Sequence, residues 1–239
     1  MNPDNKDMDD DAEFGASELG IKEYWDSVYA RETRNFIANG DIGEIWFGEK
    51  TAAKMVNWIL KHAPNKSTKI LDLGCGNGHI LLDLASHNYT NLTGIDYSPD
   101  AIELAKSVSQ ERGYKHMIEY HVVDLLSDNI QIGAESNDIG FDIVLDKGTY
   151  DAISMNPEIV AKRERGEKDS YPGLVKRLLS KKSEYSIFLI TSCNWTKEEL
   201  VQRFGDEFDY HSYVEHPTFT FGGITGQTIS TVAFKLNEK

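Results

Sequence analysis

The sequence predicts an α/β fold in which helices cover both faces of a mostly parallel β-sheet. Beyond residue 65, short apolar runs alternate with amphipathic helical stretches, as in βαβ units. A glycine-rich turn, "DLGCGNG", joins the first of these runs to a helix, as in doubly wound sheets. The final two strand-like runs have no helix-length connector between them, so we expect them to pair antiparallel.

Length and composition are those of a globular protein with one such domain. The chain has 239 residues, enough to bury a full core. No apolar run is long enough to span a bilayer, and the first residues lack the basic and apolar regions of a signal peptide. Its two cysteines, Cys75 and Cys193, argue against a disulfide scaffold or a zinc site. We therefore expect a cytoplasmic protein.

The chain is strongly acidic, with a formal net charge of −14. Such a surface repels phosphate backbones, which argues against direct nucleic-acid binding, and it suits a basic protein partner. Residues 1–13 hold six acidic residues against one lysine, and we expect residues 1–16 to form a disordered tail. By composition alone, a solvating tail without a specific role is the favoured explanation.

Residues 17–65 are expected to form a helical cap or lid. The stretch "ELGIKEYWDSVYARETRNFIANGD" has apolar residues at helical spacing, and Gly40 or Asp41 should end that helix. A connector with two large aromatics, "IGEIWFGE", follows. A second amphipathic helix, "KTAAKMVNWILKHA", should stop at Pro64.

The domain at residues 66–239 is expected to alternate strands and helices. A helix from Asn77 to Ser86 should follow the glycine turn, and a second helix should begin with Ser98 as its cap and Pro99 in its first position. Thr196 and Glu199 form a capping-box pattern before a third helix. The expected strands are "KILDLG", "LTGIDY", "IEYHVVD", "FDIVLD", "SIFLITS", "FDYHSYVEH" and "QTISTVAFKL".

The glycine turn, with Gly74, Gly76 and Gly78, can serve several cofactors and is a weak signal alone. Asp96 ends the second strand, 20 residues beyond Gly76, where a carboxylate can accept hydrogen bonds from both ribose hydroxyls. NAD and S-adenosylmethionine both satisfy that arrangement. Asp96 could also be an ordinary turn acid.

Three features favour S-adenosylmethionine over NAD. The spacing is Gly-x-Gly-x-Gly and not the dinucleotide Gly-x-Gly-x-x-Gly. Asp72 precedes the first glycine by two residues, where a negative charge suits an ammonium and a sulfonium and repels a pyrophosphate. Asp124 ends the third strand, where it can accept from an adenine amine. Asp72 could instead be a helix cap, and Asp124 alone is ambiguous.

These residues resemble the class I S-adenosylmethionine-dependent methyltransferases, over roughly residues 66–236. The resemblance implies a Rossmann-like fold with a seven-stranded, mostly parallel sheet and an antiparallel last strand. It also implies S-adenosyl-L-methionine as the cofactor. The cofactor site that we predict comprises Trp46, Asp72, Gly74, Gly76, Asn77, Asp96, Tyr97, Asp124, Leu125 and Asp146.

The stretch after the fourth strand, "DKGTYDAIS", bears on the methyl acceptor. It lacks the Asn/Asp-Pro-Pro-aromatic motif of base and glutamine methyltransferases, and no Pro-Cys nucleophile occurs. Together with "YWDSVY", "GEIWFGE", "FLITSCNWT" and "FTFGG", it is similar to the lysine methyltransferases that act on translation elongation factor 1-alpha. That resemblance implies this elongation factor as the protein substrate.

We predict that Asp146 orients the substrate amine, with Tyr150 and Asp151 as further catalytic candidates. Asn194 and Trp195 are expected to line the substrate side. Each of these five residues could instead cap or pack a helix. Trp25, Trp46, Phe47 and Gly48 are expected to form the lid over cofactor and substrate.

Two other functions remain open at this point. One is a small-molecule methyltransferase of the same fold, which would have a closed pocket. The other is a non-catalytic cofactor-binding partner of the translation machinery. The seven histidines show no metal-ligand spacing, so no metal is expected, and the acidic surface favours a monomer that engages a basic partner.

Overall fold

The computed structural model describes residues 15–127, 130, 132, 140–221 and 224–237. The predicted acidic tail therefore lies almost wholly outside the described residues, as does most of the polar loop at 127–140. Within the described ranges, no helix has the length and apolar character needed to cross a membrane.

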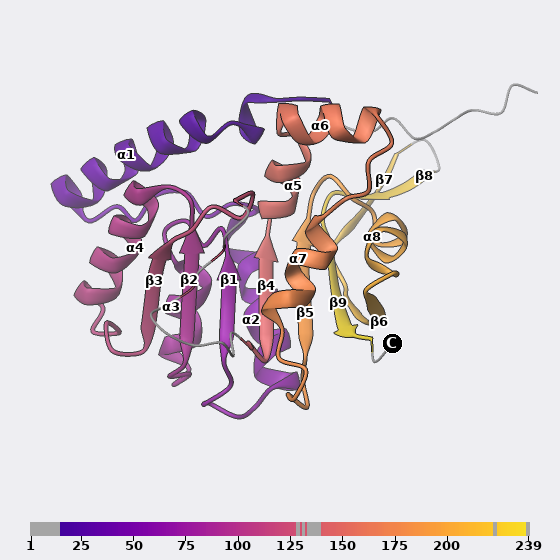
Figure 1. The fold of residues 1–239 in the computed structure, drawn as a ribbon. Helices are drawn as coiled ribbons and strands as arrows, with labels where there is room; N and C mark the ends of the chain where they lie inside the picture. Colours follow the sequence, from indigo (N-terminus) through magenta and orange to yellow (C-terminus); the bar gives the residue numbers. More distant parts are fainter. Residues whose placement is uncertain (1–14, 128–129, 131, 133–139, 222–223, 238–239) are drawn as a thin grey trace, which may run out of the picture.

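A seven-stranded sheet forms the centre of the molecule, in the order β3-β2-β1-β4-β5-β9-β6 (Figure 1). Neighbouring strands are parallel from β3 to β5, and β9 is antiparallel to both β5 and β6. Both the seven strands and the antiparallel last strand confirm the sequence prediction. The strands are β1 (Ile70–Leu73), β2 (Leu92–Asp96), β3 (Ile118–Val122), β4 (Ile143–Lys147), β5 (Ile187–Ser192), β6 (Phe208–Val214) and β9 (Ser230–Leu236).

Helices cover both faces of this sheet, as predicted. Buried side chains of α2, α3 and α4 pack on one face, and those of α7 and α8 pack on the other. Helix α1 lies across the carboxyl ends of the strands, at the top of Figure 1, and packs against α4. The helices are η1 (Glu18–Gly20), α1 (Lys22–Asn39), α2 (Gly48–His62), α3 (His79–Ser86), α4 (Pro99–Glu111), α5 (Thr149–Ser154), α6 (Pro157–Glu164), α7 (Tyr171–Leu178) and α8 (Lys197–Phe204).

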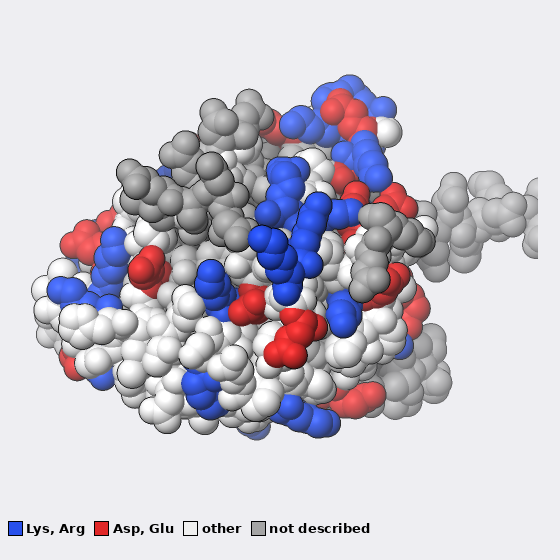
Figure 2. Space-filling view, turned by 60° about the horizontal axis from the view of Figure 1, so that its bottom comes forward, with Lys and Arg blue, Asp and Glu red and all other residues white. Residues whose placement is uncertain are grey.

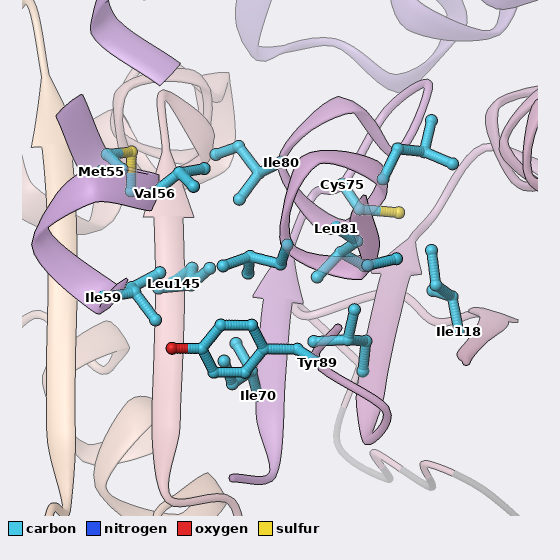
Figure 3. Close-up of a cluster of buried hydrophobic side chains, with 14 of the residues drawn as sticks. Met55, Val56, Ile59, Ile70, Cys75, Ile80, Leu81, Tyr89, Ile118 and Leu145 are labelled. Atoms are coloured by element: carbon cyan, nitrogen blue, oxygen red, sulfur yellow. The ribbon is translucent and has the colours of Figure 1, made fainter. Parts of the chain in front are cut away.

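The side chains of β4 alternate between two hydrophobic clusters, because successive residues of a strand point to opposite faces. Leu145 belongs to the cluster beneath α2 and α3, where Figure 3 places it beside Ile59. Val144 belongs to the cluster beneath α7 and α8. The same alternation fixes the directions of Asp146 and Lys147, and it decides below which of the two can reach a ligand.

Local sequence signals explain most of the helix ends. Gly40 ends α1 in the left-handed conformation, as expected. The capping box of Thr196 and Glu199 is present at α8. Ser98 and Pro99 occupy the predicted positions at the start of α4, but the Ser98 side chain makes no capping hydrogen bond.

Several elements differ from the sequence prediction. Helix α3 begins at His79, two residues later than expected, because Gly78 at φ +76° forms its N-cap. Helices α6 and α7 were not expected. The charged stretch at 161–169 overlaps α6 and obscures its apolar periodicity, whereas the apolar spacing of Tyr171, Leu174 and Leu178 in α7 was overlooked. A short antiparallel ribbon of β7 (Thr218–Phe221) and β8 (Ile224–Gln227) was also missed.

Candidate functional site

A pocket of about 210 Å³ opens at the carboxyl ends of β1, β2 and β4. The strand order reverses between β1 and β4, and ligands of open α/β sheets bind at such a point. The N-terminal segment covers the pocket. Its lining includes Trp25, Tyr29, Trp46, Asp72, Gly74, Gly76, Asn77, Asp96, Tyr97, Asp124, Leu125, Lys147 and Thr149.

The glycine turn brings backbone close to the pocket at positions that accept no side chain. Gly74 has φ +61° and Gly76 has φ +52°, both in the left-handed region. A Cβ on Gly74 would collide with the Thr149 hydroxyl, and one on Gly76 would collide with the Tyr29 hydroxyl. The two glycines therefore leave open a cradle that a Cβ would fill.

The Asp96 carboxylate is held rigidly at the end of β2. Its Oδ2 accepts the Gly76 N–H at 3.0 Å, and its Oδ1 accepts the Ser98 N–H at 2.9 Å. Burial raises the pKa of Asp96 to about 6, although both hydrogen bonds oppose the shift. A buried carboxylate on the pocket wall is suited to accept two vicinal hydroxyls from a ribose.

Two further predicted carboxylates also line the pocket, in different surroundings. Asp72 is buried, and burial raises its pKa to about 7, while the nearby Lys147 ammonium lowers it. Asp124 is exposed at the end of β3, and its Oδ1 accepts the Leu126 N–H at 2.8 Å. Asp72 therefore supplies negative charge inside the pocket, and Asp124 supplies an acceptor at its rim.

The connector, residues 40–47 between α1 and α2, is held by side chains from several elements. Asn77 Nδ2 donates to the carbonyl oxygens of Ile42 at 3.0 Å and Glu44 at 3.3 Å. Buried Glu32 accepts the Glu44 N–H at 3.2 Å. Lys147 Nζ donates to the Trp46 carbonyl at 3.1 Å.

Aromatic rings of the N-terminal segment meet over the pocket. The ring centroids of Trp25 and Trp46 lie 4.6 Å apart in an edge-on arrangement, and both residues line the pocket. Phe47 and Gly48, the other predicted lid residues, are not in its lining. Phe47 instead lies beneath Lys147, 5.8 Å from its ammonium.

Asp146, predicted to act in catalysis and cofactor binding, is not among the residues that line the pocket. It is fully buried and pairs in register with Leu73, whose side chain belongs to the cluster on the opposite face of the sheet. Its carboxylate accepts the N–H groups of Thr149 at 2.9 Å and Tyr150 at 3.0 Å. Asp146 therefore caps α5, which was the structural alternative for it.

Tyr150 and Asp151 also lie outside the pocket lining. The Tyr150 hydroxyl donates to Asp169 at 2.5 Å. Asp151 accepts the Ser192 hydroxyl at 2.5 Å and the Cys193 N–H at 2.8 Å, so it joins α5 to the end of β5. Both side chains are buried and serve packing.

Asn194 and Trp195 are likewise absent from the pocket lining. Trp195 is buried in the cluster beneath α8, where its ring lies 5.9 Å from Tyr150 and 3.8 Å from the Arg203 guanidinium. The structure thus gathers all five catalytic and substrate candidates around α5 and α8, and brings none of their side chains to the pocket.

The polar side chains of the pocket that sequence reasoning overlooked include Tyr29, Lys147 and Thr149. Thr149 donates its hydroxyl to the Leu73 carbonyl at 2.7 Å. The alternation along β4 would have identified Lys147, because this residue shares a face with Leu145. Asp146, between them, points the other way.

Charge is unevenly distributed over the surface despite the net negative total. Figure 2 shows lysines and arginines gathered over the part of the molecule that carries α6 and α7. Several are paired, such as Lys168 with Asp206 at 2.8 Å and Lys176 with Glu207 at 2.7 Å. Among the described residues, no group of three or more His, Cys, Asp or Glu side chains could hold a metal ion.

Comparison with known proteins supports the interpretation of this pocket. The family model described as "Methyltransferase domain" matches residues 64–235. "EEF1A lysine methyltransferase 2" of Mus musculus is 40% identical over 235 residues, which cover 98% of this chain and 90% of that protein. "Protein-lysine N-methyltransferase EFM4" of Saccharomyces cerevisiae is 38% identical over 236 residues, covering 95% and 98%.

A solved structure shares the fold. The magnesium protoporphyrin IX methyltransferase (ChlM) from Synechocystis PCC 6803, with bound SAM, aligns with a TM-score of 0.58. The alignment covers 93% of this chain and 99% of that chain at 16% identity, so the likeness concerns the fold alone.

Proposed function

This chain belongs to the methyltransferase family, and from that premise we propose that it is an S-adenosylmethionine-dependent protein-lysine N-methyltransferase acting on translation elongation factor 1-alpha. The observation that carries the proposal is the pocket at the sheet's switch point, where Asp72 and Asp96 face a glycine cradle. Relatives at 38–41% identity over at least 92% of this chain are named lysine methyltransferases, and several names specify EEF1A.

The residues present fit that cofactor. Asp96 would accept both ribose hydroxyls, Asp124 the adenine amine, and Asp72 would face the ammonium of the amino-acid end. The cradle at Gly74 and Gly76 lets the ligand approach the backbone closely. When bound, S-adenosylmethionine supplies an electrophilic methyl group on a sulfonium.

A lysine nucleophile must reach this pocket as a neutral amine. At pH ~7 its deprotonation costs roughly 4–5 kcal/mol, given an ordinary pKa of ~10.4. Desolvation of the amine beside the cofactor's sulfonium would disfavour its charged form and offset part of that cost. The proton can leave to water before the transfer, so the proposal requires no dedicated base. Asp146 is not proposed to orient the amine, because it caps α5.

We extend the proposal to the predicted domains and location. Residues 17–65 act as a cap over the cofactor, in line with the pocket contacts of Trp25 and Trp46. The protein works in the cytoplasm as a monomer that engages a basic partner, a prediction that rests on composition and charge.

The test is transfer of labelled methyl groups to purified elongation factor 1-alpha, followed by mass spectrometry of the modified peptides. We expect label on a lysine, and Asp96→Ala should lose about 10- to 100-fold in cofactor affinity and lose labelling with it. Asp209→Ala, a matched change at an exposed aspartate on the β6 edge, should label like the wild type.

Other outcomes would point to the alternatives. Cofactor binding with label only on small molecules of a cell extract would favour a small-molecule methyltransferase. Cofactor binding with no transfer to any acceptor would favour a non-catalytic partner of the translation machinery. Failure to bind S-adenosylmethionine would refute the proposal altogether.

A further inference from the structure

Asp72 and Lys147 lie on the same face of the sheet, on adjacent parallel strands. Asp72 pairs in register with Leu145, two residues before Lys147, so the two charged side chains are diagonal neighbours. Both line the pocket beyond the ends of β1 and β4. The pocket wall therefore presents one anion and one cation side by side.

The Lys147 ammonium is incompletely used by the protein. An ammonium has three donors, and Lys147 Nζ uses one of them in its hydrogen bond to the Trp46 carbonyl at 3.1 Å. Among the ion pairs of the described residues, none joins Lys147 to a carboxylate within 4.0 Å. A buried ammonium with unused donors and no carboxylate partner is stabilised when an anionic ligand binds to it.

Asp72 and Lys147 influence each other's pKa although they form no direct ion pair. The Lys147 ammonium lowers the pKa of Asp72, and the Asp72 carboxylate raises the pKa of Lys147, each against a larger opposite effect of burial. Each charge is therefore stabilised by the other, and both remain available to a third group. The complementary ligand carries an ammonium and a carboxylate on neighbouring atoms, as an α-amino acid does.

We propose that Lys147 binds the carboxylate of the cofactor's amino-acid end, while Asp72 faces the ammonium of the same end. This inference rests on the proposed function and adds a residue that holds the cofactor. The same ammonium would contact both the ligand and, through the Trp46 carbonyl, the connector. A bound carboxylate would therefore order the Lys147 side chain and with it the connector.

The alternative is a purely structural latch between β4 and the connector. A latch would stabilise every ligand beneath it equally, whereas a carboxylate-binding lysine distinguishes ligands by their carboxylate. A comparison of ligands that differ in this group therefore separates the two roles, and it needs no turnover.

The experiment is calorimetric titration with S-adenosylhomocysteine and with its decarboxylated analogue, in which hydrogen replaces the carboxylate. We expect the wild type to prefer S-adenosylhomocysteine by about 10- to 100-fold. Lys147→Met should reduce that preference to within about threefold, and Lys147→Arg should retain most of it. Lys61→Met is the matched control, because Lys61 is exposed on α2 and does not line the pocket.

The possible outcomes are distinct. Equal loss of both ligands in Lys147→Met, with the preference intact, would overturn the inference and support the latch. An unchanged preference with unchanged affinity would also overturn it. If the wild type bound neither ligand, the proposed function would fail first and this inference with it. Thermal unfolding of each variant identifies a variant that fails to fold, in which case Lys147→Arg and Lys147→Gln decide the question by the same comparison.

Discussion

The Tyr171 hydroxyl donates a hydrogen bond to the Asp146 carboxylate, with 2.5 Å between the two oxygens. Tyr171 begins α7 and Asp146 lies near the end of β4, so this bond joins a helix to the central strand on the face opposite the pocket. The same carboxylate caps α5 through two backbone N–H groups. Asp146 therefore fixes the start of α5, whose Thr149 borders the pocket.

Tyr171→Phe should lower the free energy of unfolding by about 1–3 kcal/mol, because a buried carboxylate loses a donor. Cofactor affinity should change little, since neither residue lines the pocket. Urea denaturation and ligand titration measure the two effects. Tyr210→Phe, the same change at a residue that is 45% exposed, should alter stability by less than about 0.5 kcal/mol. A larger effect on binding than on stability would contradict the positional role.

Gly74→Ala should abolish or strongly weaken cofactor binding and destabilise the protein by about 1–3 kcal/mol. The alanine would have to adopt the left-handed conformation of Gly74, and its Cβ would collide with Thr149. Gly173→Ala is the matched control, because Gly173 lies in α7 with no atom within 4 Å of an added Cβ. That variant should be unchanged or more stable by about 0.5–1 kcal/mol. Similar behaviour of the two alanine variants would refute the cradle.

Asp72 should make the ligand-free protein less stable as pH rises. Its pKa is about 7 in the folded state and ordinary in the unfolded state, so the folded state binds the proton more tightly. The resulting stabilisation is fully present below about pH 4 and is lost as pH rises through about 7. The urea midpoint should therefore fall less between pH 5 and pH 8 in Asp72→Asn than it does in the wild type. The same charge change at exposed Asp124 is the control, and a wild-type pH slope in Asp72→Asn would contradict the prediction.

Asn77→Ala should loosen the connector over the pocket. It removes donors to the Ile42 and Glu44 carbonyls, each worth about 1 kcal/mol. We expect faster hydrogen exchange at residues 42–47 and a cofactor dissociation rate about tenfold higher. Asn39→Ala, which removes an exposed hydrogen bond to the Asp41 N–H, should leave both unchanged. Unaltered exchange in Asn77→Ala would mean that the connector does not depend on these bonds.

The sequence predicted the parts of the fold and site that depend on local chemistry. Gly40, Pro99 and the Thr196–Glu199 pair are helix signals whose action is confined to one turn, and all three occur where expected. The glycine turn and Asp72, Asp96 and Asp124 lie at or near the carboxyl ends of three neighbouring parallel strands, so they meet at one edge of the sheet.

The parts of the site that the sequence did not predict depend on side-chain direction and on contacts between residues far apart in the chain. Asp146 and Lys147 are adjacent in sequence, and pleating alone sends one into the core and the other to the pocket. Tyr150 and Trp195 resemble binding aromatics, but they stack within the cluster beneath α8. Contacts such as Asn77 with the connector, which span 33 to 35 residues, have no local signature.

The position of β9 has a consequence for how the chain is made. This strand lies between β5 and β6, and β6 borders β9 alone in the sheet. During synthesis β6 leaves the ribosome first and must wait for residues 230–236 before it has a neighbour to pair with. A chain interrupted before residue 230 would therefore lose two strands from its sheet, β9 itself and β6, which has no other neighbour there.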